Sequence, residues 1–369
     1  MDNKKIRVAI THGDTNGIGY ELIFKAFEDP MMFDLCTPIV YGSPKIAAYH
    51  CKALGIDGNS FSIINEASEA QEGRINLLPV FDDDVKVDLG MPSQEASRAA
   101  IKSIDRAITD YKNGLFDVLV TGPVDKNNMH VDGYDFICNE KFIENSIGEG
   151  KKGVDILINE IMRIAFVTDD IALKDVPAAI TKESIIDKVA QLYATLRRDF
   201  SIESPRIAVL ALNPNDSDAH PGKEEQESIM PAIQQLSDVG VCVFGPYQAE
   251  TFFGGGDFAS FDCILAMYHD QGTTPLKLTN PDDNIHYLGG LPLVSTSADM
   301  GPQYEIAGLG KADAGALRHA IYQAIDCFRT RQEFDKPYAN PLQKLYRERR
   351  DESEKARFNM PKKRDADKA

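Results

Sequence analysis

Short runs of β-branched and other apolar residues recur along this chain, separated by longer segments in which apolar residues follow a helical period. These runs occupy residues 6–10, 37–42, 117–122, 163–168, 206–212 and 263–268. Alternation of this kind is typical of β and α units arranged around a largely parallel sheet. The clearest helix is predicted over 94–113, with Ser93 as its cap and Gly114 at its end. The pattern therefore predicts an α/β protein.

Length and composition indicate an ordinary globular protein. A chain of 369 residues, 43% hydrophobic and 26% charged, can form two medium-sized lobes. The formal charge of −17 disfavours nucleic acid as a partner, and no apolar stretch approaches the roughly 20 residues that cross a bilayer. The first residues lack the features of a signal peptide, and the six scattered cysteines form no C-x-x-C pair. We expect a cytoplasmic protein that binds neither nucleic acid nor membrane.

Four polar loops follow predicted strands. The segments THGDTNGIGYEL at 11–22 and VTGPVDKNN at 120–128 are the first two. The first has glycines that permit close backbone approach, but not the spacing of the dinucleotide fingerprint G-x-G-x-x-G, and alone it is compatible with a simple tight turn. The second offers Lys126 as a cation, with a structural lysine as an equal alternative.

The other two loops carry histidines. His220 lies in LNPNDSDAHPGKEEQE at 212–227, and AMYHDQGTTPLKL at 266–278 sets His269 and Asp270 directly after an apolar run, with Lys277 close by. A His-Asp pair at a strand end can bind a metal or transfer protons; the alternative is a capped turn. Loops at the ends of parallel strands converge, so we expect the four loops to form one active-site cleft.

Successive motifs of the chain resemble those of the 4-hydroxythreonine-4-phosphate dehydrogenases over roughly residues 5 to 330. The motifs are GDTNGIGYEL, VTGPVDK, LNP with HPGKEE, GPYQAETFF, MYHDQG and TSADMGPQYEIAGLGKA. The resemblance implies a two-lobed α/β/α fold of the isocitrate and isopropylmalate dehydrogenase type, with the active site between the lobes. It also implies a homodimer that shares a divalent metal site, and NAD-dependent oxidation of a secondary alcohol followed by loss of carbon dioxide.

Carried over residue by residue, the family's metal ligands fall on Asp170, His220 and His269. Asp170 stands where the family has a third histidine, and Asp169 is a spare candidate. Such a set is compatible with zinc, magnesium, manganese or cobalt. Asp270 is expected to orient this shell.

The predicted substrate residues differ more from the family. Asn139 and Glu140 replace a His-Thr pair, Lys277 is retained, and His286 and Ser295 stand for an asparagine and an arginine. Replacing a guanidinium by a hydroxyl removes a permanent charge. Together with Lys126, these residues are expected to bind a small anionic hydroxy acid, and Asp270, Lys277 and Lys126 are the catalytic candidates.

The resemblance places NAD, or NADP, against the segment that begins TSADMGPQYEIAGLG, with a helix predicted over 312–329. The cofactor candidates there are Gly301, Pro302, Gln303 and Glu305. An alternative is that this loop serves only to cap the helix.

We expect a first lobe of residues 1–126 plus 298–335, a second lobe of residues 127–297, and a charged tail of residues 336–369. The hypothesis is oxidation and decarboxylation of 4-hydroxythreonine 4-phosphate or a close analogue, in pyridoxal phosphate biosynthesis. One alternative is a dehydrogenase for a different small hydroxy acid. Another is a catalytically silent paralogue that acts as a ligand-binding or interaction protein.

Overall fold

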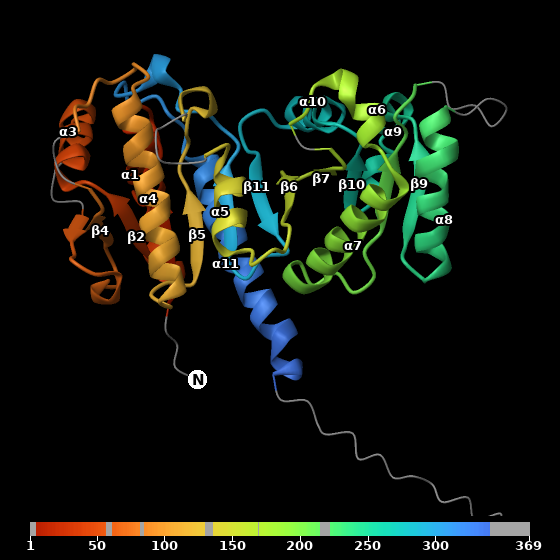
Figure 1. Cartoon of the computed structure of the whole chain (residues 1–369). Coiled ribbons are helices and arrows are strands. Elements are labelled where there is room, and N and C mark those ends of the chain that lie inside the picture. Colours follow the sequence, from red (N-terminus) through yellow and green to blue (C-terminus); the bar gives the residue numbers. More distant parts are fainter. Residues whose placement is uncertain are drawn as a thin grey trace, which may run out of the picture.

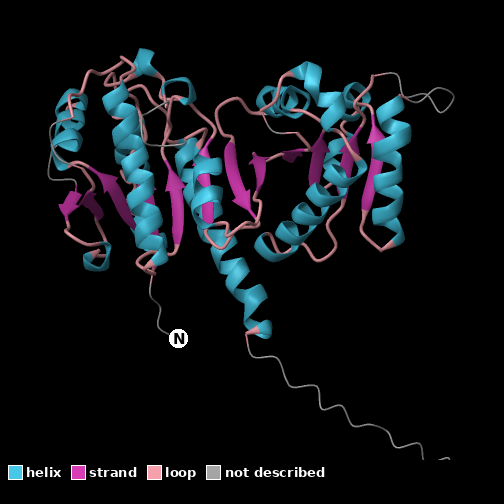
Figure 2. Ribbon diagram, in the orientation of Figure 1, coloured by secondary structure: helices cyan, strands magenta, loops and turns pink. Residues whose placement is uncertain are grey.

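One mixed sheet runs through the whole molecule (Figure 1, Figure 2). This computed structural model describes residues 5–56, 61–81, 85–129, 136–168, 170–214 and 222–339. Within them, the sheet has the strand order β3-β4-β2-β1-β5-β12-β11-β6-β7-β10-β8-β9. The strands are β1 Ile6–Thr11, β2 Cys36–Gly42, β3 Phe61–Ile63, β4 Ile75–Pro79, β5 Val118–Thr121, β6 Val154–Ile158, β7 Arg163–Phe166, β8 Ile207–Leu210, β9 Val243–Tyr247, β10 Cys263–Ala266, β11 Ile285–Gly289 and β12 Val294–Ala298.

Helices cover both faces of the sheet. The α-helices are α1 Gly19–Ala26, α2 Met32–Leu35, α3 Pro44–Leu54, α4 Gln94–Lys112, α5 Asn139–Ile147, α6 Val176–Ala179, α7 Lys182–Asp199, α8 Met230–Asp238, α9 Ala249–Gly254, α10 His269–Thr279 and α11 Gly315–Asp335. Side chains of α1, α3 and α11 pack in one hydrophobic core, whereas those of α4 and α5 pack in another across the sheet. All seven residues of β2 are buried, as expected for a strand covered on both sides.

Two groups of parallel strands meet at a short antiparallel section. β11 runs antiparallel to both β12 and β6, and β6 runs antiparallel to β7, while the other neighbouring strands are parallel. The prediction of a mostly parallel α/β fold is confirmed. The sheet is continuous where β12 bonds β5 and β11, so the lobe boundaries after residues 126 and 297 stay a prediction.

The clearest sequence prediction is confirmed at α4. Ser93 Oγ accepts a hydrogen bond from the backbone N–H of Ala96 at 3.1 Å, and the helix ends at Lys112, just before the predicted Gly114. The helix predicted over 312–329 is α11, which begins at Gly315 and continues to Asp335. None of the described helices is long and apolar enough to cross a membrane.

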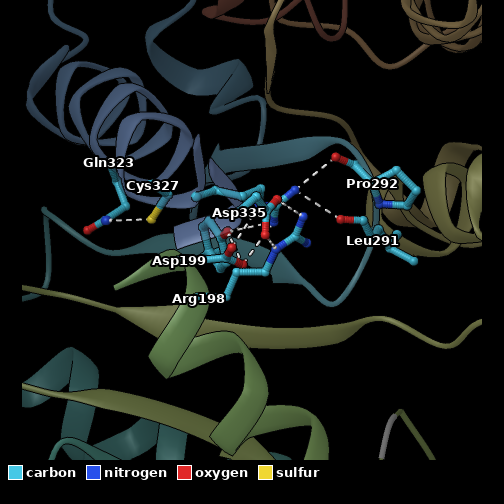
Figure 3. A network of polar contacts seen from close by, with 9 residues as sticks. Arg198, Asp199, Leu291, Pro292, Gln323, Cys327 and Asp335 are labelled. Atoms are coloured by element: carbon cyan, nitrogen blue, oxygen red, sulfur yellow. Dashed lines mark hydrogen bonds and ion pairs between the residues drawn. The ribbon is translucent and has the colours of Figure 1, made fainter. Parts of the chain in front are cut away.

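A buried ion pair joins α11 to α7 (Figure 3). The Arg331 guanidinium donates to both carboxylate oxygens of Asp199, at 2.7 and 2.8 Å, and the two side chains are 6% and 1% exposed. Arg331 also donates to the carbonyls of Leu291 and Pro292, between β11 and β12. Tyr287 on β11 donates to Asp199 at 2.7 Å. Every strong donor of this network therefore has an acceptor, which a buried ion pair requires.

We predict that Arg331→Met lowers the free energy of unfolding by about 3–5 kcal/mol, because it leaves the Asp199 carboxylate buried without its counter-ion. Urea unfolding followed by circular dichroism measures this loss. The neighbouring pair of Arg198 and Asp335 is a matched control, since both side chains are more than a third exposed. Arg198→Met should cost only about 0–1 kcal/mol. Equal losses in the two variants would contradict the role given to the buried pair.

His12 is a fully buried histidine beside the start of α1. Its ring stacks on Tyr20, with centroids 5.3 Å apart, and meets the edge of Phe81. Within the described part of the chain, neither of its ring nitrogens forms a hydrogen bond of good geometry. Burial, and then the neighbouring His50, lowers the pKa of His12 from 6.5 to about 3. The folded protein therefore holds this ring neutral.

We predict that stability falls as the pH is lowered from 6.5 towards 3. In that window the unfolded chain binds a proton at residue 12 that the folded chain does not, which costs about 1.4 kcal/mol per pH unit. His12→Phe should reduce the slope of unfolding free energy against pH by up to about 1.4 kcal/mol per pH unit, which corresponds to one bound proton. Burial also lowers the pKa of His50. The variant therefore keeps the part of the pH dependence that comes from His50. Identical slopes for the wild type and His12→Phe would show that residue 12 is not the cause.

Candidate functional site

Two adjoining cavities lie where the two parallel groups of strands meet. The central cavity, of about 250 Å³, extends from the end of β5 across the faces of β6 and β11 to the ends of β7 and β10. The loop cavity, of about 310 Å³, lies between the loop after β5 and the loop after β12. Lys126, Glu140 and His286 line both cavities. Residues from both predicted lobes therefore meet at one site.

Two of the predicted metal ligands line the central cavity. Asp170 follows β7 and His269 begins α10 directly after β10. The Nδ1 atom of His269 lies 2.9 Å from Oδ1 of Asp270, and the imidazole stacks on the ring of Phe166. A hydrogen bond at Nδ1 fixes the ring and leaves Nε2 as the nitrogen able to bind a metal. Asp270 is absent from the lining of the central cavity, so it acts on the site through His269.

The third predicted ligand, His220, lies outside the described residues, as does the spare candidate Asp169. Within the described part of the chain, no group of three potential ligands is close enough to hold a metal ion. Asp170 and His269 would therefore need a further ligand to complete a metal site.

Glu225 organises the loop that follows β8. Its fully buried carboxylate accepts hydrogen bonds from the backbone N–H groups of Leu212 and Asn213, at 2.8 and 2.9 Å, and from the Asn213 side chain. Gly222 leaves room for this carboxylate, since a Cβ at that position would overlap it. Glu225 begins a turn of π-helix, Glu225–Ile229, a feature common at functional sites. Glu225 is not among the predicted site residues, although it lies within the histidine-bearing motif.

A chain of charged groups runs from the wall between the cavities to Lys277, a predicted site residue that lines neither cavity. His286 Nδ1 lies 2.8 Å from Asp155 Oδ2, and His286 Nε2 lies 3.4 Å from Asp299 Oδ1. Asp299 Oδ2 in turn lies 2.9 Å from Lys277 Nζ. Burial opposes the charge on His286, but Asp155, then Asp299 and Glu140, outweigh it and hold the pKa of His286 well above 6.5. The pKa of Asp299 is lowered by His286 and Lys277 against the effect of burial.

The remaining predicted substrate residues differ in access. Glu140 lines both cavities and accepts a hydrogen bond from Ser297 Oγ at 3.3 Å. Asn139 lines the loop cavity, donates to Thr121 Oγ1 at 3.1 Å, and has a buried Oδ1 without a partner. Ser295 is 3% exposed on β12 and lines neither cavity. Ser295 could contact a substrate only if the residues that cover it moved away.

Lys126 is an exposed residue with several acidic neighbours. Burial opposes its charge, but Glu140, and then Cys138, Asp170 and Asp155, raise the pKa of Lys126 above 10.5. Lys126 is therefore an ammonium ion at neutral pH, suited to holding an anionic group and unsuited to accepting a proton.

The predicted cofactor loop forms one side of the loop cavity. Gly301 and Pro302 line it, whereas Gln303 and Glu305 do not. The carbonyl of Pro302 accepts a hydrogen bond from the backbone N–H of Ile18, and Gly17 leaves space for the proline that a Cβ would fill. Gly17, in the motif at 11–22, thus allows the first loop to pack against the cofactor loop.

Comparison with known proteins gives the family. A family model described as pyridoxal phosphate biosynthetic protein PdxA matches residues 34–324. The chain belongs to this family. A 4-hydroxythreonine-4-phosphate dehydrogenase of Bacteroides thetaiotaomicron is 46% identical over 360 residues, which cover 97% of this chain and 99% of that protein. One from a Sulfurihydrogenibium species is 33% identical, covering 89% of this chain and 100% of that protein.

Solved structures agree with the assignment. A 4-hydroxythreonine-4-phosphate dehydrogenase from Klebsiella pneumoniae superposes with a TM-score of 0.76 at 26% identity, covering 89% of this PdxA-family chain and 99% of that one. A terephthalate 1,2-cis-dihydrodiol dehydrogenase from Burkholderia xenovorans, with a TM-score of 0.57 and 21% identity over 88% of this chain and 98% of that one, shares the fold. The resemblance found in the sequence motifs is confirmed.

Proposed function

We propose that this PdxA-family chain oxidises 4-hydroxythreonine 4-phosphate with a nicotinamide cofactor, as the names of its relatives indicate. The observation that carries the proposal is the meeting of the two cavities. Asp170 and His269 line the central cavity, Gly301 and Pro302 line the loop cavity, and Lys126 lies on their shared wall. A dehydrogenase needs this arrangement, because the alcohol carbon must lie next to the nicotinamide ring.

The donor atoms of the central cavity fit a divalent metal. Asp170 offers a carboxylate, His269 offers Nε2 of a ring fixed by Asp270, and His220 is the proposed third ligand. Two histidines and a carboxylate are compatible with zinc, magnesium, manganese or cobalt. When bound, such an ion would act as a Lewis acid that stabilises negative charge on the alcohol oxygen as it becomes a carbonyl.

The protein's own side chains bind and orient the substrate. Lys126 and Lys277 are proposed to receive its anionic groups. Asp299 holds Lys277 in an ion pair, and Glu140 is an acidic neighbour of Lys126. Oxidation moves a hydride to the nicotinamide and a proton to a base, and the resulting β-keto acid then loses carbon dioxide. A fixed cation beside the carbonyl oxygen would stabilise the enolate that forms when carbon dioxide leaves.

NAD or NADP is proposed to place its nicotinamide in the loop cavity, against Gly301 and Pro302. Apart from its two chain neighbours, Gly301 has no described residue within 4 Å of the position of a Cβ, so its backbone is open to a ligand. Gln303 and Glu305 would contact more distant parts of the nucleotide. We also propose a cytoplasmic homodimer that shares the metal site.

An enzyme for another hydroxy acid is the second candidate. Glu140 brings a carboxylate into the shared wall, and Ser295 is too buried to supply a charged contact. Both features would suit a substrate that differs from the phosphate ester in its charged groups. A silent paralogue would bind neither metal nor nucleotide.

We predict that the purified protein binds about one divalent ion per subunit, as one ligand set implies, together with NAD, and oxidises 4-hydroxythreonine 4-phosphate. Asp170→Ala and His269→Ala should lose the metal, measured by elemental analysis. Asp270→Asn should weaken metal binding by about 10- to 100-fold, because it removes the partner that orients His269.

Asp175→Ala is a matched control, since Asp175 is an exposed carboxylate on the segment that follows Asp170. This variant should keep its metal and its activity. A wild-type protein that binds neither metal nor nucleotide after supplementation would exclude the dehydrogenase. Turnover of unphosphorylated hydroxy acids in preference to the phosphate ester would instead favour the second candidate.

A further inference from the structure

The wall shared by the two cavities alternates in charge. Lys126, Glu140 and His286 line both cavities, and Asp155 lines the central cavity beside them. A ligand that carried only negative charge would meet two carboxylates here. A ligand that carried both signs of charge would match the wall.

The carboxylate of Asp155 is paired with His286. His286 has a carboxylate at each ring nitrogen, Asp155 at 2.8 Å and Asp299 at 3.4 Å. An imidazole that faces an acceptor at both nitrogens must carry a hydrogen on both, so it is an imidazolium ion. The Asp155 side chain is 35% exposed, and the central cavity is the space that it lines. Asp155 thus presents to the cavity a carboxylate whose Oδ2 is paired with His286 and whose Oδ1 is buried.

Glu140 presents a second carboxylate from the first turn of α5. Ser297 Oγ donates to its Oε1, which fixes the side chain across the wall. Glu140 and Asp155 both act electrostatically on His286 and on Lys126, so all four groups form one cluster. The other carboxylates of the central cavity have different partners. Glu144 binds Lys141 Nζ at 3.2 Å and the backbone N–H of Gly153 at 2.8 Å, and Asp170 is a proposed metal ligand.

We propose that Glu140 and Asp155 form a subsite for the ammonium group of the substrate, so that this chain selects a hydroxy amino acid over a hydroxy acid without the amino group. This inference rests on the proposed function, because the substrate named there carries an ammonium group next to its carboxylate. The two carboxylates accept its N–H donors, while Lys126 and Lys277 receive the anionic groups. Charge-assisted hydrogen bonds of this kind are about twice as strong as hydrogen bonds between neutral groups.

The test compares two ligands by calorimetry and by turnover. One is 4-hydroxythreonine 4-phosphate, and the other is 3,4-dihydroxybutanoate 4-phosphate, the same molecule without its amino group. The wild type should favour the amino compound by about 10- to 100-fold, the effect of a charge-assisted hydrogen bond. Glu140→Gln and Asp155→Asn should lose most of this preference, chiefly through KM for the amino compound. Glu144→Gln, a carboxylate of the same cavity with other partners, should retain it.

The outcomes separate this inference from the proposed function. If the wild type oxidises both compounds with the same KM, the ammonium subsite is wrong and the dehydrogenase stands. If it neither binds nor oxidises the amino compound, both proposals fail together. Loss of bound metal from Glu140→Gln would show that this carboxylate serves the metal, which also overturns the subsite. Because Asp155→Asn disturbs His286 as well, Glu140→Gln is the deciding variant.

Discussion

The contact between α11 and α7 fixes the geometry on which the site depends. α11 packs against β12 and β5, whereas α7 packs against β6 and β11. Arg331 and Asp199 connect these two helices, and Arg331 also binds the carbonyls of Leu291 and Pro292 in the turn that joins β11 to β12. Since both cavities are lined by residues from both sides of this turn, a shift of one helix against the other would move their walls apart.

Charge balance is the second constraint on the site. Carboxylates and cations alternate closely from Asp155 through His286 and Asp299, which line the cavities, to Lys277, which lies outside both. Each buried charge has a partner, which lowers the cost of removing it from water. The arrangement also limits which ligands the cavity can accept, because an added charge must replace one partner or complement another.

The sequence predicted the fold class and the strands that begin the polar loops, because their apolar runs are unambiguous. Among the described strands it missed β3, β4, β6, β9, β11 and β12. In β12 the sequence VSTSA is polar although every residue is buried, since its hydroxyl groups find hydrogen-bond partners such as the carbonyl of Ala320. Asp155 was missed as a site residue because it lies within strand β6. Asp299 was missed although it belongs to the motif that begins TSADMG, because the candidates in that motif all follow Met300. Their proximity to His286 depends on the pairing of β11 with β6 and β12, which no local pattern encodes.

The central claim is that the two cavities form one site, in which substrate in the central cavity and nicotinamide in the loop cavity meet beside Lys126, Glu140 and His286, the residues that line both. A crystal structure of the protein with NAD and the phosphorylated substrate tests this claim most directly. The account predicts the nicotinamide ring against Gly301 and Pro302, and the alcohol carbon in the central cavity beside Lys126. A nucleotide bound elsewhere on the protein, with the loop cavity filled by water, would contradict it.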